Sequence, residues 1–187
     1  MSELKRPIPE SYWVEPGRFL AGEYPGYSQD EQLRQRIDSF LDLGINTFID
    51  LTDSNELPHY LPLLKEQAGY YDIDIHYKRF TITDHTVHTT ETMRAILDEI
   101  DSSLAAGRKV YLHCWGGIGR TGTAVGCYLV RHGRTGQQAL AQLAEWWQDV
   151  PKSRLWPHTP ETQWQMEFIL YWDEDSPSPT LTPDPSP

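Results

Sequence analysis

A cysteine, three glycines and an arginine lie within one short segment whose spacing suits the binding of a small oxyanion. The segment covers residues 113–123 (HCWGGIGRTGT). The apolar run 109–113 predicts a strand that ends here, and the residues from 120 onward predict a helix. Glycines at such a junction let backbone N–H groups converge on one point, and the helix N-terminus adds its positive end. These glycines are Gly116, Gly117 and Gly119. The segment therefore predicts an anion-binding loop.

Cys114 and Arg120 are the reactive and charged side chains of this loop. Arg120 follows Cys114 by six residues, and its planar guanidinium can donate to two oxygens of one oxyanion, a geometry that lysine lacks. Helix N-termini and nearby cations lower the pKa of a cysteine from about 8.5 to roughly 3.5–7.5. We therefore expect Cys114 to be a thiolate, and hence a nucleophile, at neutral pH. The competing interpretation of Cys114 is a small buried thiol.

The pattern HC-x5-R-[ST], formed by His113, Cys114, Arg120 and Thr121, resembles the signature of the cysteine-dependent protein tyrosine phosphatase superfamily. The loop is most similar to that of the compact dual-specificity branch, which includes archaeal and bacterial single-domain phosphatases and kinase-associated phosphatases. The likeness extends over about residues 18–172, as a pattern rather than as identity outside the signature. The resemblance implies a hydrolase of phosphomonoesters that needs neither a metal nor a cofactor.

The resemblance also implies a mechanism. Cys114 attacks phosphorus in line and takes the phosphoryl group, while Arg120 and the loop amides hold the equatorial oxygens. The loop residues that bind substrate in this way are Trp115, Gly116, Gly117, Ile118 and Gly119. Asp84, thirty residues before Cys114, corresponds to the general acid that protonates the leaving oxygen and then activates water. A solvated loop aspartate, or an N-cap for the following helix, is the alternative for Asp84.

Four further residues take positions that the resemblance associates with the site. The hydroxyl of Thr121 would help the thiolate leave in the second step, and His113 would orient the loop through hydrogen bonds. Gln165, in ETQWQ, would position the hydrolytic water. Glu56 would pair with Arg120 or act as a reserve acid. Trp156, in a proline-flanked loop, is a candidate for substrate contact.

Other chemistries remain open at this point. A thiol redox or sulfur-transfer enzyme also needs a low-pKa cysteine, but it requires a resolving thiol, and the chain has only Cys127 besides Cys114. Cys127 lies in an apolar helical pattern that favours the core, with oxidative pairing as the alternative. His85 and His88 lack a third ligand at metal-site spacing, which favours plain loop histidines. A phosphate-binding module without turnover is the remaining rival.

Strand and helix patterns alternate along the chain. Strands are predicted within residues 16–25, 46–51, 71–82 and 109–113, and helices within 28–43, 57–68, 89–106, 120–132, 135–149 and 160–172. This alternation predicts an α/β fold with a central, mostly parallel sheet of about four to five strands flanked by helices. We expect a single phosphatase domain over residues 1–172 and a disordered tail, rich in Pro, Ser and Asp, over 173–187.

The charge and the hydropathy of the chain limit the kinds of partner and the location that we expect for it. A net charge of −11 over 187 residues argues against nucleic acid and anionic membranes as partners. Residues 102–144 contain no Asp or Glu and predict a local positive field suited to a small anion. No run approaches the roughly 18 apolar residues of a membrane span, so a cytoplasmic location is expected. We also expect the protein to be a monomer.

The expected substrate is a phosphoprotein or phosphopeptide. The resemblance implies action on phosphotyrosine, with phosphoserine and phosphothreonine admitted by the shallow cleft of compact relatives. Phosphoinositide phosphatases of the superfamily carry lysines within the signature loop, and residues 115–119 contain none. A phosphoinositide or another small phosphorylated molecule is the alternative substrate.

Overall fold

The protein folds around a five-stranded sheet with strand order β1-β2-β5-β3-β4. The computed structural model describes residues 4–26, 30–83 and 89–175. The strands are β1 (Ser11–Glu15), β2 (Phe19–Gly22), β3 (Thr47–Asp50), β4 (His76–Arg79) and β5 (Val110–His113). The predicted α/β fold, with a mostly parallel sheet flanked by helices, is confirmed.

The four strands β2, β5, β3 and β4 are parallel, and β1 pairs antiparallel with β2 at one edge. Parallel strands end at the same edge of a sheet, where α/β proteins bind their ligands. His113, at the end of the central strand β5, lies beside Gly22 of β2 and Asp50 of β3. The residue that follows it, Cys114, is therefore placed at the ligand-binding edge.

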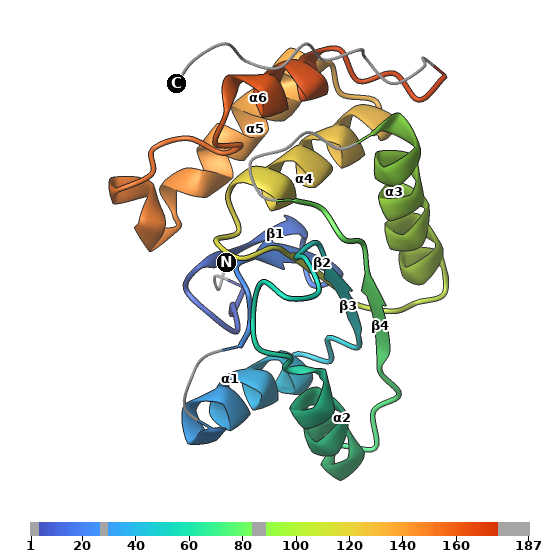
Figure 1. Cartoon of the computed structure of the whole chain (residues 1–187), viewed down its shortest axis with the longest axis vertical. Helices are drawn as coiled ribbons and strands as arrows, with labels where there is room; N and C mark the ends of the chain where they lie inside the picture. The colour runs from blue at the N-terminus through green and yellow to red at the C-terminus, as the bar shows by residue number, and fades with distance from the viewer. Residues whose placement is uncertain (1–3, 27–29, 84–88, 176–187) are drawn as a thin grey trace.

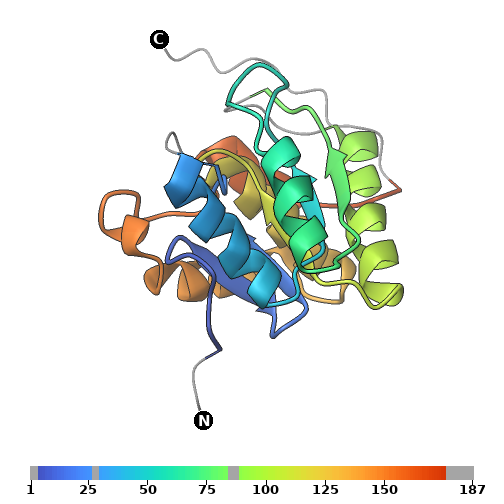
Figure 2. The ribbon, with the colours of Figure 1, turned by 90° about the horizontal axis from the view of Figure 1, so that it is seen from below.

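Helices cover both faces of the sheet. They are α1 (Asp30–Asp42), α2 (Leu61–Tyr70), α3 (Thr90–Ala105), α4 (Gly119–Arg131), α5 (Gly136–Gln148) and α6 (Gln163–Leu170), with a short 3-10 helix η1 (Pro151–Arg154). Figure 1 shows α1 and α2 on one side of the sheet and α3 to α6 on the other, and Figure 2 shows α1 and α2 in front of the strands. No helix within the described ranges is long and apolar enough to cross a membrane.

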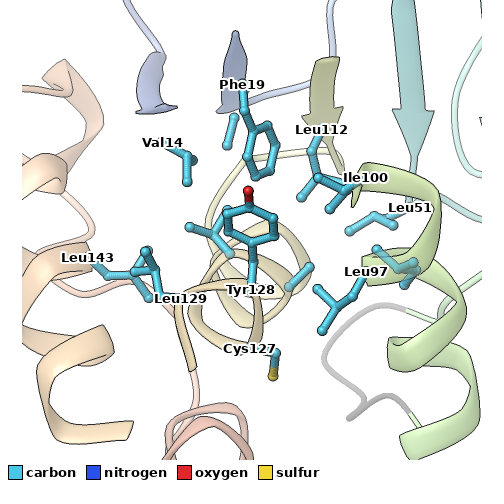
Figure 3. Packing of buried hydrophobic residues seen from close by; sticks show 14 of the residues in the cluster. Val14, Phe19, Leu51, Leu97, Ile100, Leu112, Cys127, Tyr128, Leu129 and Leu143 are labelled. Atoms are coloured by element: carbon cyan, nitrogen blue, oxygen red, sulfur yellow. The ribbon is translucent and has the colours of Figure 1, made fainter. Parts of the chain in front are cut away.

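Each face of the sheet has its own hydrophobic core. Successive strand residues point to opposite faces, so Val110 and Leu112 of β5 belong to the core under α3 to α6, while Tyr111 belongs to the core under α1 and α2. Figure 3 shows the larger core, where Leu112 lies among side chains from β2 and α3, with Cys127 on α4. Cys127 is fully buried, which confirms it as a core residue.

Two glycines let other segments approach α4 closely. A Cβ atom on Gly126 would lie 2.3 Å from Cδ1 of Ile169 in α6, and one on Gly122 would lie 2.3 Å from Oγ1 of Thr159. Any larger residue at either position would push α6 and the segment before it away from α4. These contacts bring the region around Gln165 next to the start of α4.

Most predicted elements are present, with shorter bounds. The strand expected over 71–82 is only β4, the helix expected over 57–68 begins at Leu61, and the last helix covers Gln163–Leu170 rather than 160–172. The helix starts at Thr89 and Thr135 are confirmed, because each threonine hydroxyl caps its helix by accepting a hydrogen bond from the backbone N–H three residues later. The sequence analysis did not predict strand β1, which becomes recognisable through its antiparallel pairing with β2.

Candidate active site

The predicted anion-binding loop joins β5 to α4 at the carboxyl edge of the sheet. Cys114 follows β5 directly, and Arg120 is the second residue of α4. Both side chains are almost fully buried, with exposed fractions of 3% and 1%. A cavity of about 380 Å³ lies over the loop and is lined by Cys114, Trp115, Gly116, Ile118, Gly119, Lys152, Trp156 and Glu161. The cavity therefore leads from the surface to the Cys114 thiol.

Three carbonyl groups of the loop are held by donors from outside it. The carbonyl of Trp115 accepts from the backbone N–H of Tyr24 (2.9 Å), that of Gly116 from Lys152 Nζ (3.2 Å), and that of Ile118 from Thr159 Oγ1 (2.9 Å). In a planar trans peptide the N–H points away from the C=O. The N–H groups of the residues that follow, all three of them glycines, therefore point away from these donors.

The three glycines of the loop serve different purposes. Gly117 has a φ of +74°, and a Cβ atom there would lie 2.5 Å from the carbonyl carbon of Gly22, so only glycine fits. At Gly119 a Cβ atom would lie 2.9 Å from Nε2 of Gln165. At Gly116 the nearest atoms are 3.5 Å away, which is ordinary contact. Gly117 is thus the position where the loop shape depends most on glycine.

The guanidinium of Arg120 is held in one plane by Glu56. Nη1 donates to Oε2 of Glu56 (2.7 Å) and Nη2 to Oε1 (2.6 Å), while Nη1 also donates to the carbonyl of Ile82 (2.9 Å). Burial raises the pKa of Glu56, but the hydrogen bonds from Arg120 and from the backbone N–H of Asp53, together with the charge of Arg120, outweigh burial and lower this pKa. Such a bidentate pair fixes the orientation of both side chains. Glu56 therefore pairs with Arg120, as the family resemblance implied.

The acid-free stretch 102–144 is less positive in the folded protein than expected. Three of its four arginines pair with carboxylates from outside the stretch: Arg108 with Asp74, Arg120 with Glu56, and Arg131 with Asp98, Asp101 and Glu174. The expectation considered charge along the sequence, whereas the fold brings acids from other elements to the same places. The attraction for an anion therefore depends on local N–H donors, those of the loop and of Arg120, rather than on a positive field from the whole stretch.

His113 is a fully buried, neutral imidazole that supports the loop. Its Nδ1 lies 3.2 Å from the carbonyl of Cys114 and its Nε2 lies 2.7 Å from the hydroxyl of Tyr60. A carbonyl only accepts, so Nδ1 carries the proton and Nε2 accepts from Tyr60. Burial lowers the pKa of His113, which favours this neutral form. The geometry agrees with a positioning role for His113.

Asp50 forms a second buried polar group beneath the loop that the sequence analysis did not identify. Its Oδ1 accepts from the backbone N–H and the hydroxyl of Thr52 (2.8 and 2.7 Å). Its Oδ2 accepts from the hydroxyl of Tyr77 and from Nη2 of Arg79, each at 2.7 Å. Burial opposes ionisation, but the polar groups around the carboxylate, with the hydrogen bonds from Thr52 and Tyr77 among them, lower the pKa of Asp50 to about 2. The signal in the sequence that could have identified Asp50 is an aspartate at the end of an apolar strand, NTFID.

Asp50→Asn is expected to lower the free energy of unfolding at pH 7 by about 2 kcal/mol, which corresponds to the depression of the pKa from 3.8 to about 2. A carboxylate whose pKa is lower in the folded than in the unfolded protein stabilises the fold at pH values above its unfolded-state pKa. This stability is lost as the pH falls through the folded-state pKa. The difference from wild type should therefore shrink between about pH 4 and pH 2. Urea unfolding at pH 7, 4 and 2.5 measures it, with Asp149→Asn on the surface as control. A difference that stays constant with pH would contradict the assignment.

Thr121 and Gln165 are both buried close to the start of α4. Thr121 is fully buried in the first turn of α4, and its hydroxyl has no hydrogen-bond partner among the described residues. The side-chain oxygen of Gln165 accepts from the backbone N–H groups of Thr162 and Glu161 (3.1 and 3.2 Å). This fixes the amide plane and leaves Nε2 beside Gly119. Asp84, His85 and His88 lie outside the described residues.

The loop geometry agrees with a comparison against protein families. A family model described as PTP-SAK, the Swiss Army Knife protein DSP-PTPase phosphatase domain, matches residues 9–160. The chain belongs to this family. It is a phosphatase domain of the dual-specificity and protein tyrosine phosphatase type, and Cys114 and Arg120 both fall within the matched range.

Curated and solved relatives of this phosphatase domain agree with the assignment. The chain is 27% identical over 148 residues to the mouse protein tyrosine phosphatase domain-containing protein 1; the match covers 68% of this chain and 20% of that protein. The chain thus spans about a fifth of the length of this relative. The crystal structure of Tk-PTP in its active form is 26% identical, with a TM-score of 0.64 and coverage of 87% of this chain and 94% of that one.

Two further solved structures share the fold of this phosphatase domain. Kinase associated phosphatase (KAP) is 17% identical with a TM-score of 0.66, and the match covers 86% of this chain and 90% of that one. PTPMT1 in complex with PI(5)P is 19% identical with a TM-score of 0.64, and the match covers 86% and 92%. The resemblance to the compact dual-specificity branch, inferred from the HC-x5-R-[ST] pattern, is confirmed.

Proposed function

We propose that the protein is a metal-independent cysteine phosphatase that removes single phosphates from phosphoproteins through a phosphocysteine intermediate. The observation that carries the proposal is the loop itself. Cys114 lines a cavity over the glycine loop at the start of α4, whose backbone N–H groups we infer to bind the phosphoryl oxygens, next to a guanidinium held in plane by Glu56. Such an arrangement of donors stabilises the charge on the equatorial oxygens of a phosphoryl group in transfer.

The chemistry proceeds in two balanced steps. In the first, the Cys114 thiolate forms an S–P bond as the P–O bond to the leaving group breaks, and Asp84 gives its proton to the leaving oxygen. In the second, water attacks phosphorus and loses a proton to Asp84, while the S–P bond breaks. The Thr121 hydroxyl stabilises the departing thiolate, and Gln165 orients the water.

The charges around the cavity support a substrate with a single phosphate. Among the residues that line the cavity, Lys152 is a cation and Glu161 is an anion. The ammonium of Lys152 pairs with Glu23 at 2.5 Å. A ligand with several phosphates would need more cations than this lining offers. A phosphate on a peptide, where only one anionic group must enter, fits this lining better.

A phosphoinositide is the second candidate substrate, because PTPMT1, which shares the fold, has been crystallised with PI(5)P. The discriminating experiment compares an aryl phosphate, phosphotyrosine and phosphoserine peptides, and a phosphoinositide in vesicles, all in the presence of a chelator. Hydrolysis of the aryl phosphate and the peptides is expected. Loss of activity in chelator, or activity on the lipid alone, would contradict the proposal. Absence of all turnover in folded, reduced protein would favour the phosphate-binding module.

The thiol redox alternative needs a resolving thiol beside Cys114. Cys127 is fully buried in the core on α4, and burial raises its pKa well above the ordinary value. A thiol of raised pKa is a poor nucleophile at neutral pH. We therefore do not assign Cys127 a part in the reaction.

Asp84→Asn is expected to slow hydrolysis of a phosphoserine peptide by roughly 10²- to 10⁴-fold, because an alkoxide leaving group needs a proton donor. With an activated aryl phosphate the loss should be much smaller, since that leaving group departs without one. Steady-state kcat on both substrates measures the difference. Glu161→Gln, which removes the carboxylate that lines the cavity, is the control and should leave the ratio unchanged. Equal losses on both substrates would exclude Asp84 as the general acid.

We also propose the domain organisation that the sequence suggests, with a phosphatase domain over residues 1–172, a tail over 173–187, and a monomeric cytoplasmic protein. The beginning of the tail contacts the domain, because Glu174 pairs with Arg131 of α4. Limited proteolysis followed by mass spectrometry would place the boundary.

A further inference from the structure

A second cavity adjoins the cavity over Cys114. It has a volume of about 310 Å³ and is lined by Glu23, Tyr24, Gly26, Leu33, Leu57, Pro58, His59, Tyr60, Trp115 and Lys152. Trp115 and Lys152 line both cavities. The two cavities are therefore neighbours, and these two side chains form the ridge between them.

The ridge itself offers an apolar surface and a hydrogen-bond donor. The Trp115 side chain is 56% exposed, although a tryptophan is highly buried on average. The ammonium of Lys152 donates to the carbonyl of Gly116 and pairs with Glu23. Lysine has three N–H donors, so at least one of them has no acceptor among the described residues. A ligand that crosses the ridge can stack on the indole and place a carbonyl oxygen against this ammonium.

The lining of the second cavity is mainly apolar, and the one carboxylate in it is neutralised. Glu23 is nearly buried and pairs with both Arg36 and Lys152. The hydroxyl of Tyr60 points away to His113, to which it donates, so that residue offers the cavity its ring. Leu33 from α1 and Leu57 add aliphatic walls. Such a lining favours an aliphatic or aromatic group.

We propose that this second cavity binds an apolar side chain of a phosphopeptide, one to three residues from the phosphorylated residue, while Lys152 donates to a carbonyl of the peptide backbone. This inference rests on the proposed function. An extended chain advances about 3.3–3.6 Å per residue, so a short step carries it over a single indole. A peptide has a carbonyl at each residue to meet the ammonium, and the net charge of −11 disfavours approach to an anionic membrane.

The test compares phosphotyrosine peptides that differ only in Leu or Ser at each of the three positions before and after the phosphotyrosine. Wild type is expected to prefer leucine at one of these positions by about tenfold in kcat/KM, as burial of one aliphatic side chain implies. Leu33→Trp fills the cavity, and Leu33→Gln makes its wall polar. Both variants should lose the preference while hydrolysing a small aryl phosphate at the wild-type rate. Leu4→Trp and Leu4→Gln, at a residue that lines neither cavity, should keep it.

The outcomes separate this inference from the proposed function. If wild type does not hydrolyse the aryl phosphate, the proposed function itself fails. If it hydrolyses the aryl phosphate but treats each Leu and Ser pair alike, or if the Leu33 variants keep the preference, the cavity does not bind a peptide side chain. Faster hydrolysis of a phosphoinositide in vesicles, slowed by Leu33→Trp, would assign the cavity to a lipid and overturn the inference.

Discussion

Cys114→Ser is expected to abolish hydrolysis of an aryl phosphate while the protein still binds inorganic phosphate. Removal of the nucleophile from a covalent mechanism costs on the order of 10⁶-fold in kcat. The loop that binds the anion is held by groups other than the thiol, through the carbonyls of Trp115, Gly116 and Ile118. Turnover measured together with calorimetric titration of phosphate separates the two effects.

Cys127→Ser is the matched control for this substitution. Cys127 is the other free cysteine of the described chain and is buried in the core on α4. The control should lose some stability, because a hydroxyl replaces a buried sulfur, but it should keep its turnover under reducing conditions. Residual activity in Cys114→Ser that disappears in the double variant would contradict the assignment of the nucleophile. A Cys114→Ser protein that no longer binds phosphate would mean that the loop depends on the thiol.

Arg120→Lys is expected to reduce kcat by roughly 10³- to 10⁵-fold, the range observed when an arginine that stabilises a phosphoryl transition state is lost. Lysine keeps the positive charge but not the planar fork, so it cannot satisfy both oxygens of Glu56, which Nη1 and Nη2 contact at 2.7 and 2.6 Å. Affinity for phosphate should fall as well. The free energy of unfolding should also decrease, because a nearly buried ion pair loses its geometry.

Arg131→Lys distinguishes a loss of catalysis from a loss of stability. Arg131 lies at the end of the same helix, α4, and pairs with Asp98, Asp101 and Glu174. Its replacement should destabilise the protein without affecting kcat. Thermal unfolding and steady-state kinetics of both variants give the comparison. If the two variants lose activity in proportion to their loss of stability, Arg120 acts through folding and does not contact the transferred phosphoryl group.

The sequence by itself determined the parts of the site that are local in the chain. Cys114 and Arg120 are six residues apart, and the strand, the glycine loop and the helix that position them are neighbours in sequence. The conformation of such a segment follows from short-range geometry, such as the left-handed φ of +74° at Gly117. The helix caps at Thr89 and Thr135 and the alternation of strands and helices are local in the same sense.

Only the tertiary structure decided which distant groups complete the site. Tyr60 precedes His113 by 53 residues, and no pattern in the chain joins this pair. Glu56 precedes Arg120 by 64 residues, and only the family resemblance, not a local pattern, suggested that these two side chains pair. Lys152 reaches back to the carbonyl of Gly116 from beyond α5. Hydrophobic patterning along a strand or a helix records which face is buried, but not which elements meet at its end. These contacts depend on the strand order β1-β2-β5-β3-β4. This order places the ends of the parallel strands at one edge, where carboxylates and donors from distant parts of the chain meet around one cysteine.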